Sequence, residues 1–120
     1  MNQVAVIHRA FEAPEDHNTV AIVNTELEGM EALEYAYRWT NNIEGSWSRK
    51  QKMIRHEGKL YPNGDYNEAV TVMAALHEKD GVTYGLRSTS VGDWMLLGNK
   101  RYEVASMGFK EVNLEPKEGK

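Results

Sequence analysis

Residues 87–112 read RSTSVGDWMLLGNKRYEVASMGFKEV, a polar turn followed by an apolar run, a tight turn and an alternating run. Gly92 stands among turn-forming residues and is free to adopt a positive φ angle. The apolar run at 94–97 has the length of a strand, and the Gly98-Asn99 dipeptide after it allows a two-residue hairpin loop. The stretch therefore predicts a closing β-hairpin around which the rest of the fold is built.

Four more strands are expected earlier in the chain. Residues 4–11 and 19–23 are rich in β-branched and apolar side chains, and they lie close enough in sequence to pair as a first hairpin. Residues 69–76 and 82–86 are expected to pair next, because the Asp-Gly dipeptide between them is a good hairpin signal. With the closing hairpin, the sheet would then contain about six mostly antiparallel strands.

The segment 29–42 carries the pattern of an amphipathic helix. Leu33, Ala36, Tyr37 and Thr40 recur at the spacing i, i+3, i+4 and i+7, which places them on one face. One helix among so many strands covers one face of a sheet. The sequence therefore predicts an α+β fold with one main helix packed on the sheet, and it leaves open whether the sheet curls into a small barrel.

Length and composition limit the classes of protein. The 120 residues suffice for one domain, expected over 1–112, and the polar residues 113–120 are expected to form a flexible tail. A formal net charge of -4 argues against a protein that wraps nucleic acid over its whole surface. Cysteine is absent, and the four histidines lack the spacing of metal ligands, so neither a metal nor a cofactor is predicted.

The start of the chain carries no targeting pattern. It lacks the basic residues and the long apolar core of a signal peptide. No apolar run approaches the roughly 20 residues that cross a bilayer. The sequence therefore predicts a cytoplasmic protein without a membrane partner.

The irregular segment 45–66 contains the first candidate site. Aromatic and large apolar side chains in an exposed loop are typical anchors of protein–protein interfaces. The residues expected to form this protein-binding site are Trp47, Met53, Ile54 and Tyr61. Whether the segment is ordered is left open.

The same segment is also basic, which suggests a second site. Cationic side chains beside an aromatic ring are typical of a surface that contacts phosphates and stacks a base. The residues of this alternative nucleic-acid-binding site are Arg49, Lys50, Lys52, Arg55 and Lys59. The competing interpretation is a solvated loop.

The polar turn before the closing hairpin offers a weaker, anion-binding site. Arg87, Ser88, Thr89 and Ser90 supply a guanidinium, hydroxyls and turn amides. The turn lacks the Gly-Lys-Ser/Thr core of a phosphate-binding loop and precedes a strand instead of a helix. The alternative is that the hydroxyls satisfy backbone groups of the turn.

Two stretches together resemble a family of small, uncharacterised proteins encoded by bacteriophages. Residues 31–47 read EALEYAYRWTNNIEGSW, a helix ending in Thr-Asn-x-Ile and followed by Trp. The second is RSTSVGD at 87–93 with YEVASMGF at 102–109, and similar hairpins occur in YodL-like domains of mobile elements. The resemblance implies a phage origin and expression in the cytoplasm of a bacterial host. It brings no catalytic residues to carry over.

These observations predict a phage accessory protein without catalytic activity that binds a host or phage protein. A nucleic-acid-binding module is the alternative, and a small enzyme or nucleotide-binding protein acting at the polar turn is the third hypothesis. A homodimer is a further expectation, because an exposed strand edge at 4–7 would pair with a second copy.

Overall fold

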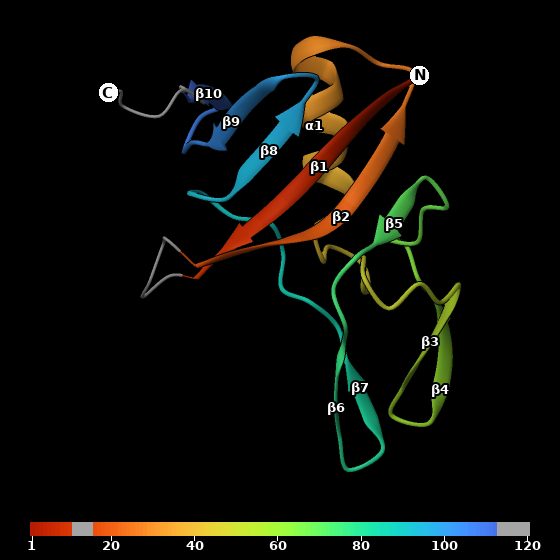
Figure 1. Ribbon diagram of the computed structural model, residues 1–120. Helices are drawn as coiled ribbons and strands as arrows, with labels where there is room; N and C mark the ends of the chain where they lie inside the picture. Colours follow the sequence, from red (N-terminus) through yellow and green to blue (C-terminus); the bar gives the residue numbers. More distant parts are fainter. Residues whose placement is uncertain (11–15, 113–120) are drawn as a thin grey trace.

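An antiparallel sheet of six strands forms the centre of the molecule, in the order β10-β9-β8-β1-β2-β5 (Figure 1). The computed structural model describes residues 1–10 and 16–112, so the predicted tail at 113–120 lies outside the described residues. The strand order has two ends, so the sheet is open and does not close into a barrel. The six strands are β1 (Asn2–Arg9), β2 (His17–Thr25), β5 (Val70–Val72), β8 (Trp94–Leu97), β9 (Lys100–Val104) and β10 (Phe109–Val112).

Helix α1 (Gly29–Trp39) packs on one face of this sheet, so the predicted α+β architecture is confirmed (Figure 1). Ala32, Leu33 and Ala36 are buried, as the helical spacing predicts, and their burial holds the helix on the strands. The helix ends at Trp39, three residues before the predicted end at 42. Thr40 then closes it, since its backbone N–H bonds to a carbonyl of the last turn.

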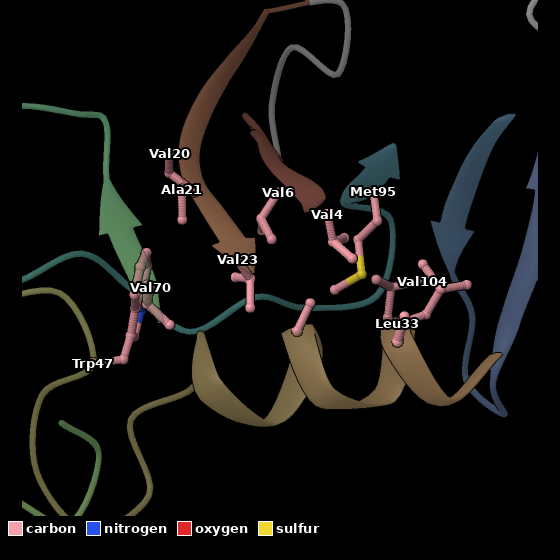
Figure 2. Close-up of a cluster of buried hydrophobic side chains, with 12 residues drawn as sticks. Val4, Val6, Val20, Ala21, Val23, Leu33, Trp47, Val70, Met95 and Val104 are labelled. Atoms are coloured by element: carbon pink, nitrogen blue, oxygen red, sulfur yellow. The ribbon is translucent and has the colours of Figure 1, made fainter. Parts of the chain in front are cut away.

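The core lies between the helix and the strands. Alternate residues of each strand point to this side, and Figure 2 shows Val4, Val23 and Met95 pointing toward the helix that carries Leu33. Full burial of one such side chain stabilises the fold by about 1.5–3 kcal/mol. The buried cluster comprises Val4, Val6, Val20, Ala21, Val23, Ala32, Leu33, Ala36, Trp47, Val70, Met95 and Val104.

Two hairpins project beyond the sheet (Figure 1). The first consists of β3 (Met53–His56) and β4 (Lys59–Pro62), within the segment that the sequence predicts to be irregular. The second consists of β6 (His77–Lys79) and β7 (Val82–Tyr84). The predicted strand at 69–76 stops at Val72, and the Asp-Gly turn joins β6 to β7 instead.

The edge proposed for a homodimer is wrong. Residues 4–7 lie in the middle of the sheet, because Val4 is paired with Val23 of β2 on one side and with Leu97 of β8 on the other. Their backbone groups are therefore already used, and no second copy can pair with them. The sheet ends instead at β10 and β5.

Strand β10 is an element that the sequence analysis misses. The returning strand of the closing hairpin ends at Val104, and a turn with Gly108 at φ 77° reverses the chain. Phe109 then pairs with Val104 and adds a further strand to the sheet. Within the described residues, no helix is long and apolar enough to serve as a membrane span.

Candidate functional site

An ion pair with a half-buried arginine and a buried carboxylate lies in the polar turn and bonds to the backbone of the first strand. The Arg87 guanidinium donates two hydrogen bonds to the Asp93 carboxylate, from Nη1 to Oδ2 at 2.7 Å and from Nη2 to Oδ1 at 2.9 Å. The backbone N–H groups of Arg9 and Ser90 donate to the same carboxylate at 2.9 and 2.8 Å. Asp93 is only 1% exposed, so these four bonds replace its hydration.

The hydrogen bonds also decide the charge of Asp93. Burial by itself would raise the pKa of this carboxyl, because it disfavours the ionised form. The bonds from Arg87 and from the backbone of Arg9 and Ser90 outweigh burial and hold the pKa below its usual value. Asp93 is therefore a charged structural group with no capacity left for a substrate.

A chain of hydroxyl groups extends from this ion pair to the helix. Thr40 Oγ1 donates to the carbonyl of Ala36 at 2.8 Å, so its single proton is used there. Thr89 Oγ1, 2.8 Å from the Thr40 hydroxyl, must then be the donor to it. His8 Nε2 lies 2.9 Å from Thr89 Oγ1 and therefore carries the proton of this bond. Burial lowers the pKa of His8 to about 4, against the opposing effect of the Asp93 charge.

These bonds show where the structure places the predicted anion-binding residues. Arg87 bonds to Asp93, Thr89 bonds to its two buried neighbours, and Ser90 Oγ donates to the carbonyl of Ser88 at 3.3 Å. Ser88 Oγ accepts the backbone N–H of Asn42 at 2.8 Å. An anion would have to compete with all of these internal bonds. We name Arg87, Asp93, His8, Thr89 and Thr40 the polar lock.

We expect the polar lock to weaken in mild acid. The pKa of His8 is about 4 in the folded protein, below the 6.5 of an unperturbed histidine, so the unfolded chain takes up a proton at a higher pH. Above pH 6.5, His8 is neutral in both states and the free energy of unfolding does not depend on it. As the pH is lowered from 6.5 to about 4, the free energy of unfolding falls by about 3 kcal/mol in total. Urea unfolding at several pH values measures this loss.

The control for this experiment is His8→Gln. Glutamine keeps an N–H donor for Thr89 but does not titrate. Its free energy of unfolding should therefore change less over the same pH range than that of the wild type. Equal pH dependence of the two proteins would show that His8 is not responsible.

Trp47 is part of the core, and its prediction as an exposed anchor is wrong. The side chain is 0% exposed, and the indole Nε1 donates to the carbonyl of Arg87 at 3.0 Å. The chain after the helix is fastened to residues 85–89, since Ser48 Oγ accepts the backbone N–H of Leu86 at 2.6 Å. These bonds join residues about 40 positions apart, so the local sequence does not predict them. They hold the Trp47 ring in the core.

The β3–β4 hairpin separates the other three predicted anchor residues. Ile54 lies directly opposite Tyr61, so their side chains share one face of the hairpin. Met53 is paired with Pro62 and belongs to the opposite face, together with Leu60. Met53 and Tyr61 are 46% and 47% exposed, so both faces present apolar surface to solvent.

A groove of about 640 Å³ opens on the face that carries Ile54 and Tyr61. The groove lies between the β3–β4 hairpin, the segment at Glu44 and Gly45 that precedes it, and Gly64 that follows it. Its lining is mainly apolar, with few polar groups. The lining residues are Glu44, Gly45, Ile54, His56, Tyr61, Pro62 and Gly64.

Two buried polar side chains hold the base of the hairpin in place. Asp65, 0% exposed, accepts the backbone N–H groups of Ile43 and Glu44 at 2.8 and 2.9 Å, and a bond from Arg38 at 3.2 Å. The Asn63 amide accepts from the N–H of Ser46 at 3.0 Å and donates to its carbonyl at 2.8 Å. In the sequence, Asn63 and Asp65 stand in a Pro-Asn-Gly-Asp segment, which is typical of a turn. A Pro-Asn-Gly-Asp turn is compatible with side chains that bond the neighbouring backbone, which is the one local signal for this role.

The structure divides the predicted nucleic-acid-binding residues into two groups. Lys50 Nζ donates to the carbonyls of Asn67 and Val70, and burial lowers its pKa despite the opposing charge of Glu68. Lys50 and the half-buried Arg49 therefore belong to the fold. The remaining three, Lys52, Arg55 and Lys59, are exposed on the hairpin or next to it.

Comparison with known proteins assigns no relative to the chain. No protein-family model, no curated protein and no solved structure matches it. The function is therefore argued from the hairpin, the groove and the polar lock.

Proposed function

We propose that this protein is a bacteriophage accessory protein without catalytic activity, which binds a host or phage protein in the cytoplasm of the bacterial host. The origin and the compartment rest on the resemblance of residues 31–47 and 87–109 to small phage proteins. The binding surface that we propose is the β3–β4 hairpin with its groove.

The distribution of exposed apolar side chains carries this proposal. Twelve large hydrophobic residues are exposed in the described part of the chain, and half of them lie within 53–84. Five of the six lie on the two projecting hairpins, and such a concentration is typical of a surface that is covered by a partner. The six residues are Met53, Leu60, Tyr61, Met73, Val82 and Tyr84.

The buried ionisable groups favour binding over chemistry. His8, Lys50 and Asp93 are the described groups with a clearly shifted pKa. Each of them bonds to another part of the chain, whereas an acid–base catalyst must reach a substrate. Their shifted pKa values are thus accounted for by structural roles.

We expect substitutions in the hairpin to weaken partner binding without unfolding the protein. The wild type and the double variant Leu60→Ser/Tyr61→Ser are immobilised, and proteins are captured from a lysate of infected bacteria. A captured protein is then purified and titrated against both. Because exposed aromatic anchors dominate interface energies, we expect the dissociation constant to rise about thirtyfold in the variant.

Met107→Ser is the matched control. Met107 is 90% exposed on the turn before β10, so its loss removes a similar apolar side chain from a different surface. It should leave the affinity unchanged. Equal affinity of the hairpin variant and the wild type would contradict the proposal.

One observation favours the alternative, a nucleic-acid-binding module. Lys52, Arg55 and Lys59 remain exposed on the hairpin or next to it, and Lys59 lies on the same hairpin face as the Tyr61 ring, as a strand-binding surface requires. Fluorescence anisotropy with a labelled single-stranded oligonucleotide tests it. Binding that weakens with added salt, and is lost when the three cations are changed to glutamate, would favour this function over the first.

A further inference from the structure

We infer that the groove binds an arginine side chain of the partner protein, with its guanidinium on Glu44. This inference rests on the proposed function and names the chemistry of the partner segment.

The groove combines apolar walls with one acidic group. Ile54, Tyr61 and Pro62 supply aliphatic and aromatic surface, and Glu44 is the only acidic residue of the lining. The lining contains no lysine or arginine that would neutralise it. A long side chain with an aliphatic stem and a positive end matches this arrangement, since the stem packs on the walls and the charge meets the carboxylate.

The position of Glu44 is set by its surroundings. Its backbone N–H is held by Asp65, and its side chain lies against Gly64. A Cβ atom added at Gly64 would stand 2.4 Å from Glu44 Oε1 and 2.8 Å from Glu44 Cβ, so any larger residue would displace the side chain. In the described part of the chain, the Glu44 carboxylate takes part in no hydrogen bond or ion pair. It is exposed and available to a partner.

A second glycine keeps the groove open. A Cβ atom at Gly45 would stand 2.1 Å from Asn63 Oδ1 and 3.1 Å from Ile54 Cδ1. Neither Gly45 nor Gly64 has a positive φ angle, so close packing and not backbone conformation explains both glycines. The shape of the groove at the base of the hairpin therefore depends on glycine at these two positions.

Arginine fits better than lysine. Its planar guanidinium can stack on an aromatic ring and can bond a carboxylate through two N–H groups at once. The Tyr61 and His56 rings, whose centroids are 6.5 Å apart, supply the stacking surface. Lys59 lies opposite His56 near the tip of the hairpin, so its positive charge would repel a guanidinium at that end of the groove. The arginine therefore belongs at the base, next to Glu44.

The experiment uses three blocked tetrapeptides, acetyl-Ala-Leu-Arg-Ala-amide and its counterparts with glutamine or glutamate in place of arginine. Each is titrated into ¹⁵N-labelled protein while the amide signals of Gly45, Tyr61 and Gly64 are followed by NMR. We expect saturable shifts with the arginine peptide and affinity roughly twofold to fivefold weaker with glutamine, the range of an exposed ion pair. The glutamate peptide should bind more weakly still.

Glu44→Gln should remove the preference for arginine over glutamine, and Glu111→Gln should leave it intact. Glu111 is an exposed acidic residue of β10, away from the groove lining, so it controls for net charge. Equal affinity of the arginine and glutamine peptides for the wild type would overturn the inference, as would a preference that persists in Glu44→Gln or the absence of shifts at the three amides.

The outcome is separable from that of the proposed function. If the hairpin variant loses the captured protein but Glu44→Gln does not, the arginine inference fails and the proposed function stands. If the hairpin variant retains the captured protein, the proposed function itself fails.

Discussion

Replacing Asp93 with alanine will lower the free energy of unfolding by about 3–4 kcal/mol. The substitution removes the buried acceptor of two bonds from Arg87 and leaves the backbone N–H groups of Arg9 and Ser90 without a partner there. Leaving a half-buried cation and two half-buried backbone donors without this acceptor costs more than losing the attraction of the pair itself. Urea unfolding at neutral pH, followed by circular dichroism, measures the loss.

Glu103→Ala is the control for Asp93. The Glu103 carboxylate stands 3.7 Å from Arg9 Nη1, and its side chain is 35% exposed, so water and salt screen this pair. The expected loss is below about 1 kcal/mol. If Asp93→Ala were as mild as Glu103→Ala, the polar lock would not be an important source of stability.

Trp47→Ala will destabilise the protein by about 3–5 kcal/mol, because it opens a large cavity at one end of the core. The substitution also removes the donor to the carbonyl of Arg87. Thermal and urea unfolding give the change in stability. A loss of under about 1 kcal/mol would contradict the burial of this ring.

Tyr61→Ala should affect partner binding and leave stability nearly unchanged, which distinguishes the role of Tyr61 from that of Trp47. Tyr61 is 47% exposed, so its loss should change stability by less than about 1 kcal/mol. It should weaken partner binding strongly, whereas Trp47→Phe, which keeps a ring in the core, should bind the partner like the wild type. The two residues, grouped together as anchors in the sequence analysis, thus have separate roles.

Local patterns were sufficient for the elements whose side chains alternate or recur on one face. The helix around Leu33 and the strands β1, β2, β8 and β9 were all predicted close to their observed positions. In these elements the spacing of the apolar residues indicates which side chains are buried, so the sequence alone predicts the type of element and its buried face. The β3–β4 and β6–β7 hairpins were missed or misplaced because they pack little against the core and carry no such pattern.

The candidate site was harder to predict because it depends on contacts between distant residues. Asp93 beside a glycine is typical of a turn, and only its approach to Arg9, 84 positions earlier, gives it a second role. Trp47 in a polar segment resembles a surface anchor until residues 85–89 fold over it. Ile54 and Tyr61 were predicted to lie in one exposed cluster with Met53, in a segment read as irregular. The strand pairing that puts Ile54 and Tyr61 on one face and Met53 on the other was not available from spacing there.

The central place of the first strand has a consequence for synthesis on the ribosome. β1 leaves the exit tunnel before the other strands of the sheet, yet one of its two neighbours, β8, begins only at Trp94. Until β8 emerges, the backbone N–H and C=O groups on one side of β1 have no neighbouring strand to pair with. An unpaired strand edge of this kind tends to pair with another chain. The nascent protein therefore completes its sheet only after β8 and the strands that follow it have emerged, and premature termination before Trp94 would yield a fragment inclined to aggregate.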